Sequence, residues 1–239
     1  MNTKLQFDIQ QQPDDATCGP TCLHAVYAYY GDCVDLAKVI QETPKLAGGG
    51  TLASLLAGHA LRRGYATTLY SFNLRVFDPT WAKLPTGQLL AKLTGRLACS
   101  RSERRKRAVQ AYMDVLEHGG RILFDDLSAD LIERFLTQSK PILTGLSATY
   151  LYQCSRELDG AKLEFDDVRG EPQGHFVVLC GYDERTREVL VADPLEPNPV
   201  NKDHFYSIPI DRVLCAILLG VLTYDGNLLL IEPKPERAN

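Results

Sequence analysis

The chain lacks a hydrophobic segment long enough to cross a membrane. Its longest apolar run, Val213 to Leu222, is about half of the roughly 20 residues that a transmembrane helix needs. The amino terminus, Met1 to Asp8, also lacks the apolar core of a secretory signal peptide. We therefore expect a chain without a membrane span and with a cytoplasmic location.

Cysteine is present in an odd number and without regular spacing. Seven cysteines in 239 residues do not form the even set that is typical of a small, disulfide-bonded secreted protein. This pattern indicates reduced thiols. We expect most of them to be buried as small hydrophobic side chains, namely Cys33, Cys99, Cys154 and Cys215.

An excess of positive charge is also missing. The formal net charge is -4, which argues against a nucleic-acid-binding surface. A hydrophobic content of 45% and a charged content of 23% are typical of a soluble globular protein, and we find no internal repeat or low-complexity segment. The length suits one large domain or two small ones.

Helical patterns dominate the first part of the chain, and strand patterns dominate the last part. This order is typical of an α+β fold with a mainly antiparallel sheet. We expect one domain over residues 1–232, with a mainly helical insertion near 73–140 and a frayed tail at 233–239. The expected helices cover 19–30, 34–40, 52–63 (capped by Thr51), 88–97, 103–118 and a further stretch that starts at Ser128 or Asp130. The expected strands cover 65–70, 141–146, 175–182, 188–193, 219–224 and 227–231, with Asp225-Gly226 as the hairpin turn between the last two.

Cys18 lies where a polar, turn-rich stretch gives way to a helix. Pro20 favours the first turn of this helix, and Gly31 suits its carboxyl end. The unpaired backbone N–H groups and the dipole at a helix amino terminus stabilise a thiolate, which is the reactive form of cysteine. The position of Cys18 therefore predicts a nucleophile.

A thiol nucleophile needs a nearby base, and among the five histidines His175 has the best setting. It opens a strand directly after the loop 170–174, and the end of a strand that faces a cleft is a common place for a catalytic side chain. The remaining histidines suit surface or core-boundary positions better, namely His24, His59, His118 and His204.

Asp193 ends the strand that follows, because Pro194 cannot continue it. If the hairpin turn centres near Arg185, Val177 pairs with Asp193. The aspartate is then a diagonal neighbour of His175 on the same face of the sheet. A carboxylate that accepts a hydrogen bond from one ring nitrogen leaves the other nitrogen for the thiol.

Gln12 precedes Cys18 by six residues, across a loop. A side-chain amide beside the thiol can donate to the oxyanion of a tetrahedral intermediate, together with the backbone N–H of Cys18. Gln10 and Gln11 are alternatives for the same role, and the sequence does not decide among the three.

Three sequence blocks together resemble the double-glycine leader peptidases, a family of bacteriocin-processing cysteine peptidases in the papain-like superfamily. The resemblance implies a stand-alone bacterial member with a papain-like fold, whose helical half carries the nucleophile and whose sheet half carries the His–Asp pair. By motif position it implies Cys18 as nucleophile, His175 as base, Asp193 as orienting acid and Gln12 as oxyanion donor. The blocks are Gln12-x5-Cys18-Gly19-Pro20, Gly174-His175-Phe176-Val177-Val178-Leu179-x-Gly181-Tyr182 and Val191-x-Asp193-Pro194.

The favoured function is a cysteine peptidase or amide hydrolase that acts on a peptide or protein substrate without a cofactor. Two alternatives use the same residues: an acyltransferase or peptide ligase, and a peptide-binding module without turnover. A metal or redox function would rest on Cys18-x3-Cys22-x-His24, but His24 points away from the other two and no second ligand pair follows. We expect Cys22 to pack beneath the site or to line it. The substrate and the oligomeric state stay open.

Overall fold

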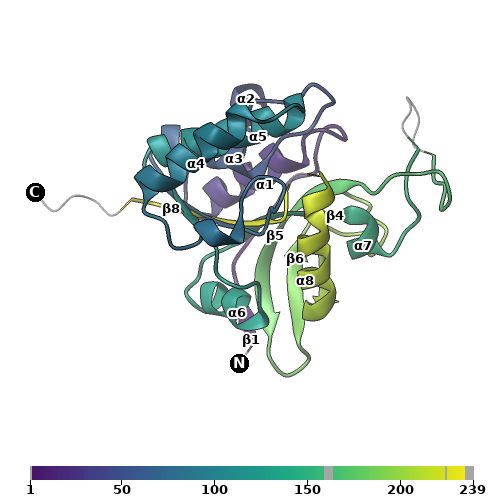
Figure 1. Cartoon of the computed structure of the whole chain (residues 1–239). Coiled ribbons are helices and arrows are strands. Elements are labelled where there is room, and N and C mark those ends of the chain that lie inside the picture. Colours follow the sequence, from purple (N-terminus) through teal and green to yellow (C-terminus); the bar gives the residue numbers. More distant parts are fainter. Residues whose placement is uncertain (1, 159–163, 224, 235–239) are drawn as a thin grey trace, which may run out of the picture.

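The computed structural model describes residues 2–158, 164–223 and 225–234, and the strands in this part form one sheet (Figure 1). The strands are β1 (Asn2–Lys4), β2 (Ala66–Ser71), β3 (Arg121–Leu123), β4 (Ile142–Ser147), β5 (Gly174–Asp183), β6 (Glu188–Ala192), β7 (Phe205–Pro209) and β8 (Asn227–Glu232). Their order is β3-β2-β8-β4-β5-β6-β7, and β1 pairs with β5. Neighbouring strands are antiparallel except β2 and β3, so the expected mainly antiparallel sheet is confirmed.

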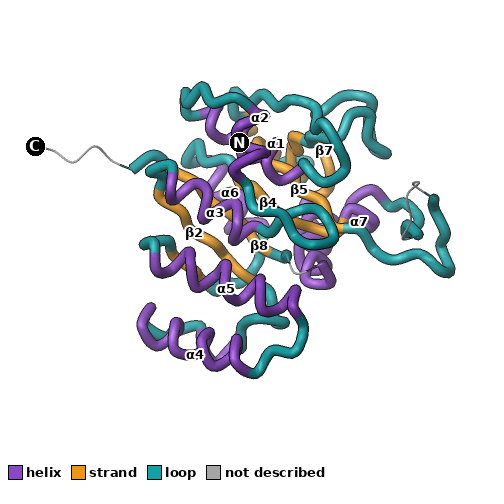
Figure 2. The backbone as a smooth tube through the Cα atoms, turned by 90° about the horizontal axis from the view of Figure 1, so that it is seen from above, coloured by secondary structure: helices purple, strands orange, loops and turns teal. Residues whose placement is uncertain are grey.

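The helices divide between two regions of the molecule. They are α1 (Cys18–Tyr29), α2 (Leu36–Glu42), α3 (Ala53–Arg62), α4 (Thr86–Ala98), α5 (Glu103–Glu117), α6 (Ala129–Thr137), α7 (Ala148–Tyr152) and α8 (Ile210–Leu219), with short 3-10 turns η1 (Pro79–Trp81) and η2 (Gly220–Thr223). The first five gather in the upper part of Figure 1, with α4 and α5 side by side in Figure 2, and α8 packs on β4. This arrangement confirms the α+β fold class.

The described part of the chain has no helix that is both long enough and apolar enough to cross a membrane. The middle stretch contributes α4, α5, α6 and β3, and its buried residues include Leu93, Tyr112 and Ile132. These side chains belong to the same hydrophobic core as the rest of the chain. The frayed tail expected at 233–239 lies outside the described residues from position 235 onwards.

The strand expected at 219–224 is wrong. Up to Thr223 this stretch is the end of α8 and the turn η2, and residue 224 lies outside the described residues. Ala216, Ile217 and Gly220 are buried in this region, and this spacing is the helical period of an apolar face. The last strand, β8, consequently pairs with β2 and β4 instead of forming a hairpin with residues 219–224.

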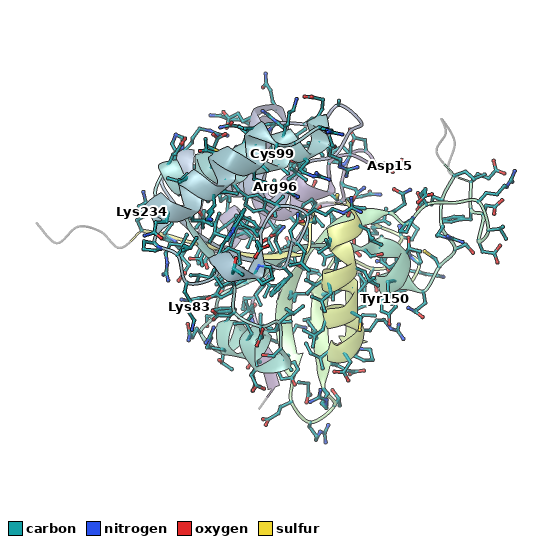
Figure 3. The ribbon with its side chains drawn as sticks, in the orientation of Figure 1. Asp15, Lys83, Arg96, Cys99, Tyr150 and Lys234 are labelled. Carbon is teal, nitrogen blue, oxygen red and sulfur yellow. The ribbon has the colours of Figure 1, made fainter. Side chains whose placement is uncertain are left out.

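The seven cysteines are free thiols, but their burial differs from the expectation. Cys33, Cys99 and Cys215 are exposed and Cys154 is half-buried, so the expected burial of these four is wrong. Cys33, Cys99 and Cys154 lie in the segments that follow α1, α4 and α7. Figure 3 labels Cys99 among the helices in the upper part of the molecule. Side chains at such helix ends face solvent because the connecting segments run over the surface of a domain.

The amino terminus of α3 is capped by a residue that is distant in the sequence. The N-cap position is Leu52, which has no polar side chain, and the Thr51 hydroxyl donates instead to the Pro44 carbonyl at 2.9 Å. The expected Thr51 cap is therefore wrong. The Oδ1 atom of Asp225 accepts a hydrogen bond from the Ala53 N–H at 3.3 Å. This contact ties the turn before β8 to the helical half.

The backbone of β4 comes unusually close to Asp225. A Cβ atom on Gly145 would lie 2.7 Å from Asp225 Cγ and 2.9 Å from Phe176 Cε1, which is closer than side chains pack. Glycine is therefore required at this position by the close approach of the neighbouring side chains.

We expect Gly145→Ala to lower the free energy of unfolding by about 1–3 kcal/mol, because the added methyl group must displace packed atoms. The matched control is Gly95→Ala in α4, where an added Cβ meets open space. That variant should raise the free energy of unfolding by about 0.5–1 kcal/mol. Chemical denaturation of both variants provides the measurement, and equal effects would contradict this account of the packing.

Candidate active site

The hairpin of β5 and β6 places Asp193 beside His175. Val178 pairs with Ala192, which is the register that the sequence predicts for this end of the hairpin. His175 is the second residue of β5, and Asp193 directly follows β6. The His175 Nε2 atom lies 2.8 Å from Asp193 Oδ1, so the two side chains form a direct hydrogen bond.

The carboxylate of Asp193 is fully buried and accepts four hydrogen bonds. Oδ1 accepts from the His175 ring at 2.8 Å and from the Leu195 N–H at 2.9 Å. Oδ2 accepts from the hydroxyl groups of Tyr152 at 2.7 Å and Tyr206 at 2.6 Å. Burial by itself raises the pKa of Asp193, but the His175 charge and the hydrogen bonds outweigh it and lower the pKa below its usual value. The ionised carboxylate is therefore held against the imidazole.

Tyr152 and Tyr206 carry no sequence signal that predicted their contact with Asp193. Tyr206 lies on β7 and pairs with Val191, two residues before Asp193, so it shares the aspartate's face of the sheet. Tyr152 is the last residue of α7. Tyr150 in the same helix is 38% exposed and is labelled on the outer side of the molecule in Figure 3. Desolvation and the negative charge of Asp193 raise the pKa of both tyrosines, so their hydroxyls stay protonated as donors.

Cys18 contacts His175 from the helical half of the molecule. It is the first residue of α1 and is 8% exposed. Burial by itself lowers the pKa of His175, but the charge and hydrogen bond of Asp193, followed by those of Cys18, raise it above its usual value. Since Nε2 faces Asp193, Nδ1 is the ring nitrogen left for the thiol. The structure thus brings Cys18, His175 and Asp193 together from separate parts of the chain.

In the described structure, Cys22 and His24 do not form a metal-binding cluster with Cys18. Cys22 is fully buried, and its thiol donates to the Phe176 carbonyl at 3.2 Å, which joins α1 to β5. Burial raises the pKa of Cys22 well above its usual value, so the thiol stays a donor. His24 Nε2 lies 3.1 Å from the Val34 carbonyl. In the described part of the chain, no group of three or more His, Cys, Asp or Glu side chains is placed to hold a metal ion.

The other histidines make contacts that suit a structural role. His118 is exposed and contacts the backbone of its own helix. His59 is 3% exposed and lies 2.8 Å from the Tyr27 hydroxyl, so the boundary position expected for it is wrong. His204 Nδ1 lies 2.7 Å from the Asp193 carbonyl and supports the backbone beside the carboxylate.

Gln12 lies on the loop that leads into α1. Its backbone N–H donates to the Pro194 carbonyl at 2.9 Å, which ties this loop to the residue after Asp193. Its side-chain Nε2 donates to the Asp14 carbonyl at 3.0 Å, and Oε1 is buried without a hydrogen-bond partner in the described structure. The amide therefore contacts its own loop and keeps a second N–H for another acceptor.

The neighbouring glutamines lie elsewhere. Gln11 donates to the Glu196 carbonyl at 2.7 Å, and Gln10 is exposed. Gln12 is thus the one of the three whose backbone is attached directly beside Asp193.

A groove of about 840 Å³ opens at Cys18. Its walls are the glycine-rich loop 45–51, the amino-terminal turns of α5, the loop 171–174 before His175, and residues 222, 223 and 225. Sites of this volume bind small molecules or several residues of a peptide. Cys18 is therefore accessible from the groove, whereas Asp193 lies buried behind the histidine.

We expect Tyr206→Phe to lower the free energy of unfolding by about 1.5–3 kcal/mol at neutral pH, because a charged buried acceptor loses a donor. Asp193 has a folded-state pKa below the ordinary 3.8, so its stabilising contribution is present above that value and is lost in acid. The deficit of the variant should therefore shrink below about pH 4. Urea denaturation across this pH range tests the expectation, with Tyr150→Phe as the exposed control. A deficit that is independent of pH would contradict it.

Comparison with solved structures finds peptidases that align over most of this chain. A protein described as a C39-like peptidase from Bacillus anthracis aligns with a TM-score of 0.50 at 14% identity, over 99% of this chain and 100% of that one. Xylellain, a cysteine protease from Xylella fastidiosa, aligns with a TM-score of 0.47 at 13% identity, over 98% and 86% of the two chains. A double glycine motif protease from an AMS/PCAT transporter, solved with the leader peptide, gives 0.44 at 13% identity, over 98% and 99%. The first of these similarities shows a papain-like α+β fold.

Sequence comparison gives a different match. Residues 98–212 match the family model described as guanylylate cyclase. This stretch is slightly less than half of the chain, contains His175 and Asp193, and begins well after Cys18. No curated protein matches the chain.

Proposed function

We propose that this chain is a cysteine peptidase of the double-glycine leader peptidase family, in which Cys18, His175 and Asp193 hydrolyse a peptide bond. The observation that carries the proposal is the continuous contact from the buried Asp193 carboxylate through His175 to a thiol at an open groove. The papain-like fold supports the same activity, because it places a nucleophile helix against a sheet that carries the base.

The proposed reaction begins with the thiol proton on His175 Nδ1 and the thiolate on Cys18. The sulfur attacks the peptide carbonyl, and the tetrahedral intermediate collapses when the imidazolium gives its proton to the leaving amine. The remaining thioester is attacked by water, whose proton goes to Nδ1, and the acid product leaves. Asp193 stays ionised throughout and holds Nε2–H, so the ring keeps the orientation that both proton transfers need.

The oxyanion would be held by donors at the start of α1. The first N–H groups of a helix have no partner within the helix, and that of Cys18 is beside the reacting sulfur. The second N–H of the Gln12 amide supplies the other donor in this proposal. The tie between Gln12 and Pro194 holds this loop against the strand end that carries Asp193.

The guanylylate cyclase match favours a second candidate function, the conversion of GTP into cyclic GMP and pyrophosphate. Lys45, Arg104 and Arg107 line the groove and carry the positive charge that a triphosphate needs. Incubation with GTP and Mg²⁺ or Mn²⁺, followed by chromatography for cyclic GMP, tests this function. Cyclic GMP production that survives Cys18→Ala would favour it over peptide hydrolysis.

We expect Cys18→Ala to abolish both peptide cleavage and labelling by iodoacetamide at about pH 5.5, where ordinary thiols are largely protonated. Cys99→Ala is the matched control, since Cys99 is exposed and lies outside the groove lining. Mass spectrometry of the labelled protein identifies the modified residue. Undiminished labelling of the Cys18→Ala protein would assign the reactive thiol to another cysteine. Product analysis with and without an added amine separates hydrolysis from acyl transfer.

The oxyanion assignment leads to a separate prediction. Gln12→Ala should lower kcat by about 10²–10³-fold with little change in KM, because the lost donor acts on the transition state. Gln11→Ala should leave kcat close to that of the wild type, since Gln11 contacts Glu196. Steady-state kinetics on a cleaved peptide provide both values. A larger loss of kcat in Gln11→Ala than in Gln12→Ala would reverse the assignment.

A further inference from the structure

Asp225 is a buried carboxylate of the groove that the proposed mechanism does not use. It is 5% exposed, and it lines the same groove as Cys18. Its Oδ1 atom accepts the hydrogen bond from Ala53 N–H at 3.3 Å, which is long for such a contact. Among the described residues, no hydrogen bond is made by its second oxygen. One oxygen of the carboxylate therefore caps a helix, and the other is left for a ligand.

The chain holds Asp225 in this place through close backbone contacts. The Asp225 N–H donates to the Gly220 carbonyl at 3.0 Å. Gly226, the next residue, has a φ of +76°, which favours glycine. The missing side chain of Gly145 makes the room that the carboxylate occupies, as the 2.7 Å approach of a Cβ atom to Asp225 Cγ indicates. Gly145 and Gly226 thus permit the position of this acid.

The ring of Phe176 lies between Gly145, which faces Asp225, and Gly19, which follows the reacting Cys18. A Cβ atom on Gly19, directly after Cys18, would lie 3.2 Å from Phe176 Cδ2, and one on Gly145 would lie 2.9 Å from Cε1 of the same ring. One aromatic ring therefore separates the start of α1 from the strand that faces Asp225. A peptide residue spans roughly 3.5 Å when extended, so a substrate bound at Cys18 brings a side chain near Asp225 within a few residues.

The protein itself leaves this carboxylate poorly compensated. Burial raises the pKa of Asp225 to about 7, although the Ala53 N–H and the charge of Arg104 lower it. Arg104 donates to the Thr223 carbonyl at 3.0 Å and acts on Asp225 through its charge. A buried acid with little compensation costs stability, and such groups concentrate at functional sites.

We propose that Asp225 binds the cationic side chain of a lysine or arginine in the peptide substrate and so contributes to the choice of substrate. This assignment rests on the proposed peptidase function, because it names the substrate class of the same groove. An ammonium or guanidinium group would donate to the free oxygen of Asp225 in a charge-assisted hydrogen bond.

The test is cleavage of a broad peptide library by the full chain, with mass spectrometry of the products to find the preferred residue at each position. Peptide pairs that carry lysine or norleucine at the preferred position then give kcat/KM. We expect the wild type to prefer lysine by about ten- to a hundredfold and Asp225→Asn to lose this preference. Asp15→Asn is the matched control and should keep it, because Asp15 is exposed at the groove.

The outcomes separate the two proposals. Cleavage by the wild type without a preference for lysine or arginine, or an equal preference in Asp225→Asn, would overturn the role of Asp225 and leave the peptidase function standing. No cleavage of any peptide, together with an unlabelled Cys18, would overturn the peptidase function and with it this assignment.

A stability measurement shows that the variant is folded and distinguishes a binding residue from a structural cap. The asparagine side chain keeps the acceptor for Ala53 N–H. In the folded protein the pKa of Asp225 is about 7, whereas the ordinary value for an aspartate is 3.8. Ionisation of Asp225 therefore lowers the free energy of unfolding as the pH rises between these two values. The charged group that acts on it is Arg104, which both proteins share.

We therefore expect Asp225→Asn to match the wild type in thermal unfolding at pH 4 and to melt at a higher temperature at pH 8. A variant that melts lower at both pH values and keeps the wild-type preference would mark Asp225 as a structural cap, and would overturn the assignment.

Discussion

The buried carboxylate of Asp193 is the interaction on which the site depends. Removing a carboxylate from water costs several kcal/mol, on the order of 3–5 kcal/mol when its partners are missing, so the fold must supply donors. The donors come from β5, from the loop after β6, from α7 and from β7. Elements that are far apart in the sequence are thus held at one point, and the ring that faces Cys18 is held there with them.

The site also lies at the junction between the helical half and the sheet half. Several hydrogen bonds cross this junction, and three of them lie at or beside the site. Cys22 donates to the backbone of β5, Gln12 donates to the backbone after Asp193, and Asp225 accepts from the start of α3. A relative movement of the halves would therefore change the position of the thiol with respect to the imidazole.

Two aspartates in this region show how surroundings decide the state of one residue type. Asp193 has four donors and a cationic neighbour, and its pKa is lowered despite complete burial. Asp225 has one long hydrogen bond and a more distant arginine, and burial dominates its pKa. The difference lies in the number of donors that face each carboxylate, which is a property of packing.

Local physics determined several features from the sequence alone. The start of α1 at Cys18 follows from the turn-rich segment before it and from Pro20. The pairing of Val178 with Ala192 agrees with the predicted hairpin register, although an irregularity between Leu179 and Gly181 separates it from the pairs next to the turn. These signals act between residues that are close in the chain, and so they could be predicted. The direct contact of His175 with Asp193 follows from that register.

Contacts between distant segments were decided only by the tertiary structure. The apolar run after Val213 suits a strand or a helix, and packing on β4 made it a helix. Neither Tyr152 nor Tyr206 carries a local mark of its role, because each becomes a donor only when folding places it beside Asp193. Asp225 was expected only as a turn residue, since the helix that it caps lies 172 residues away.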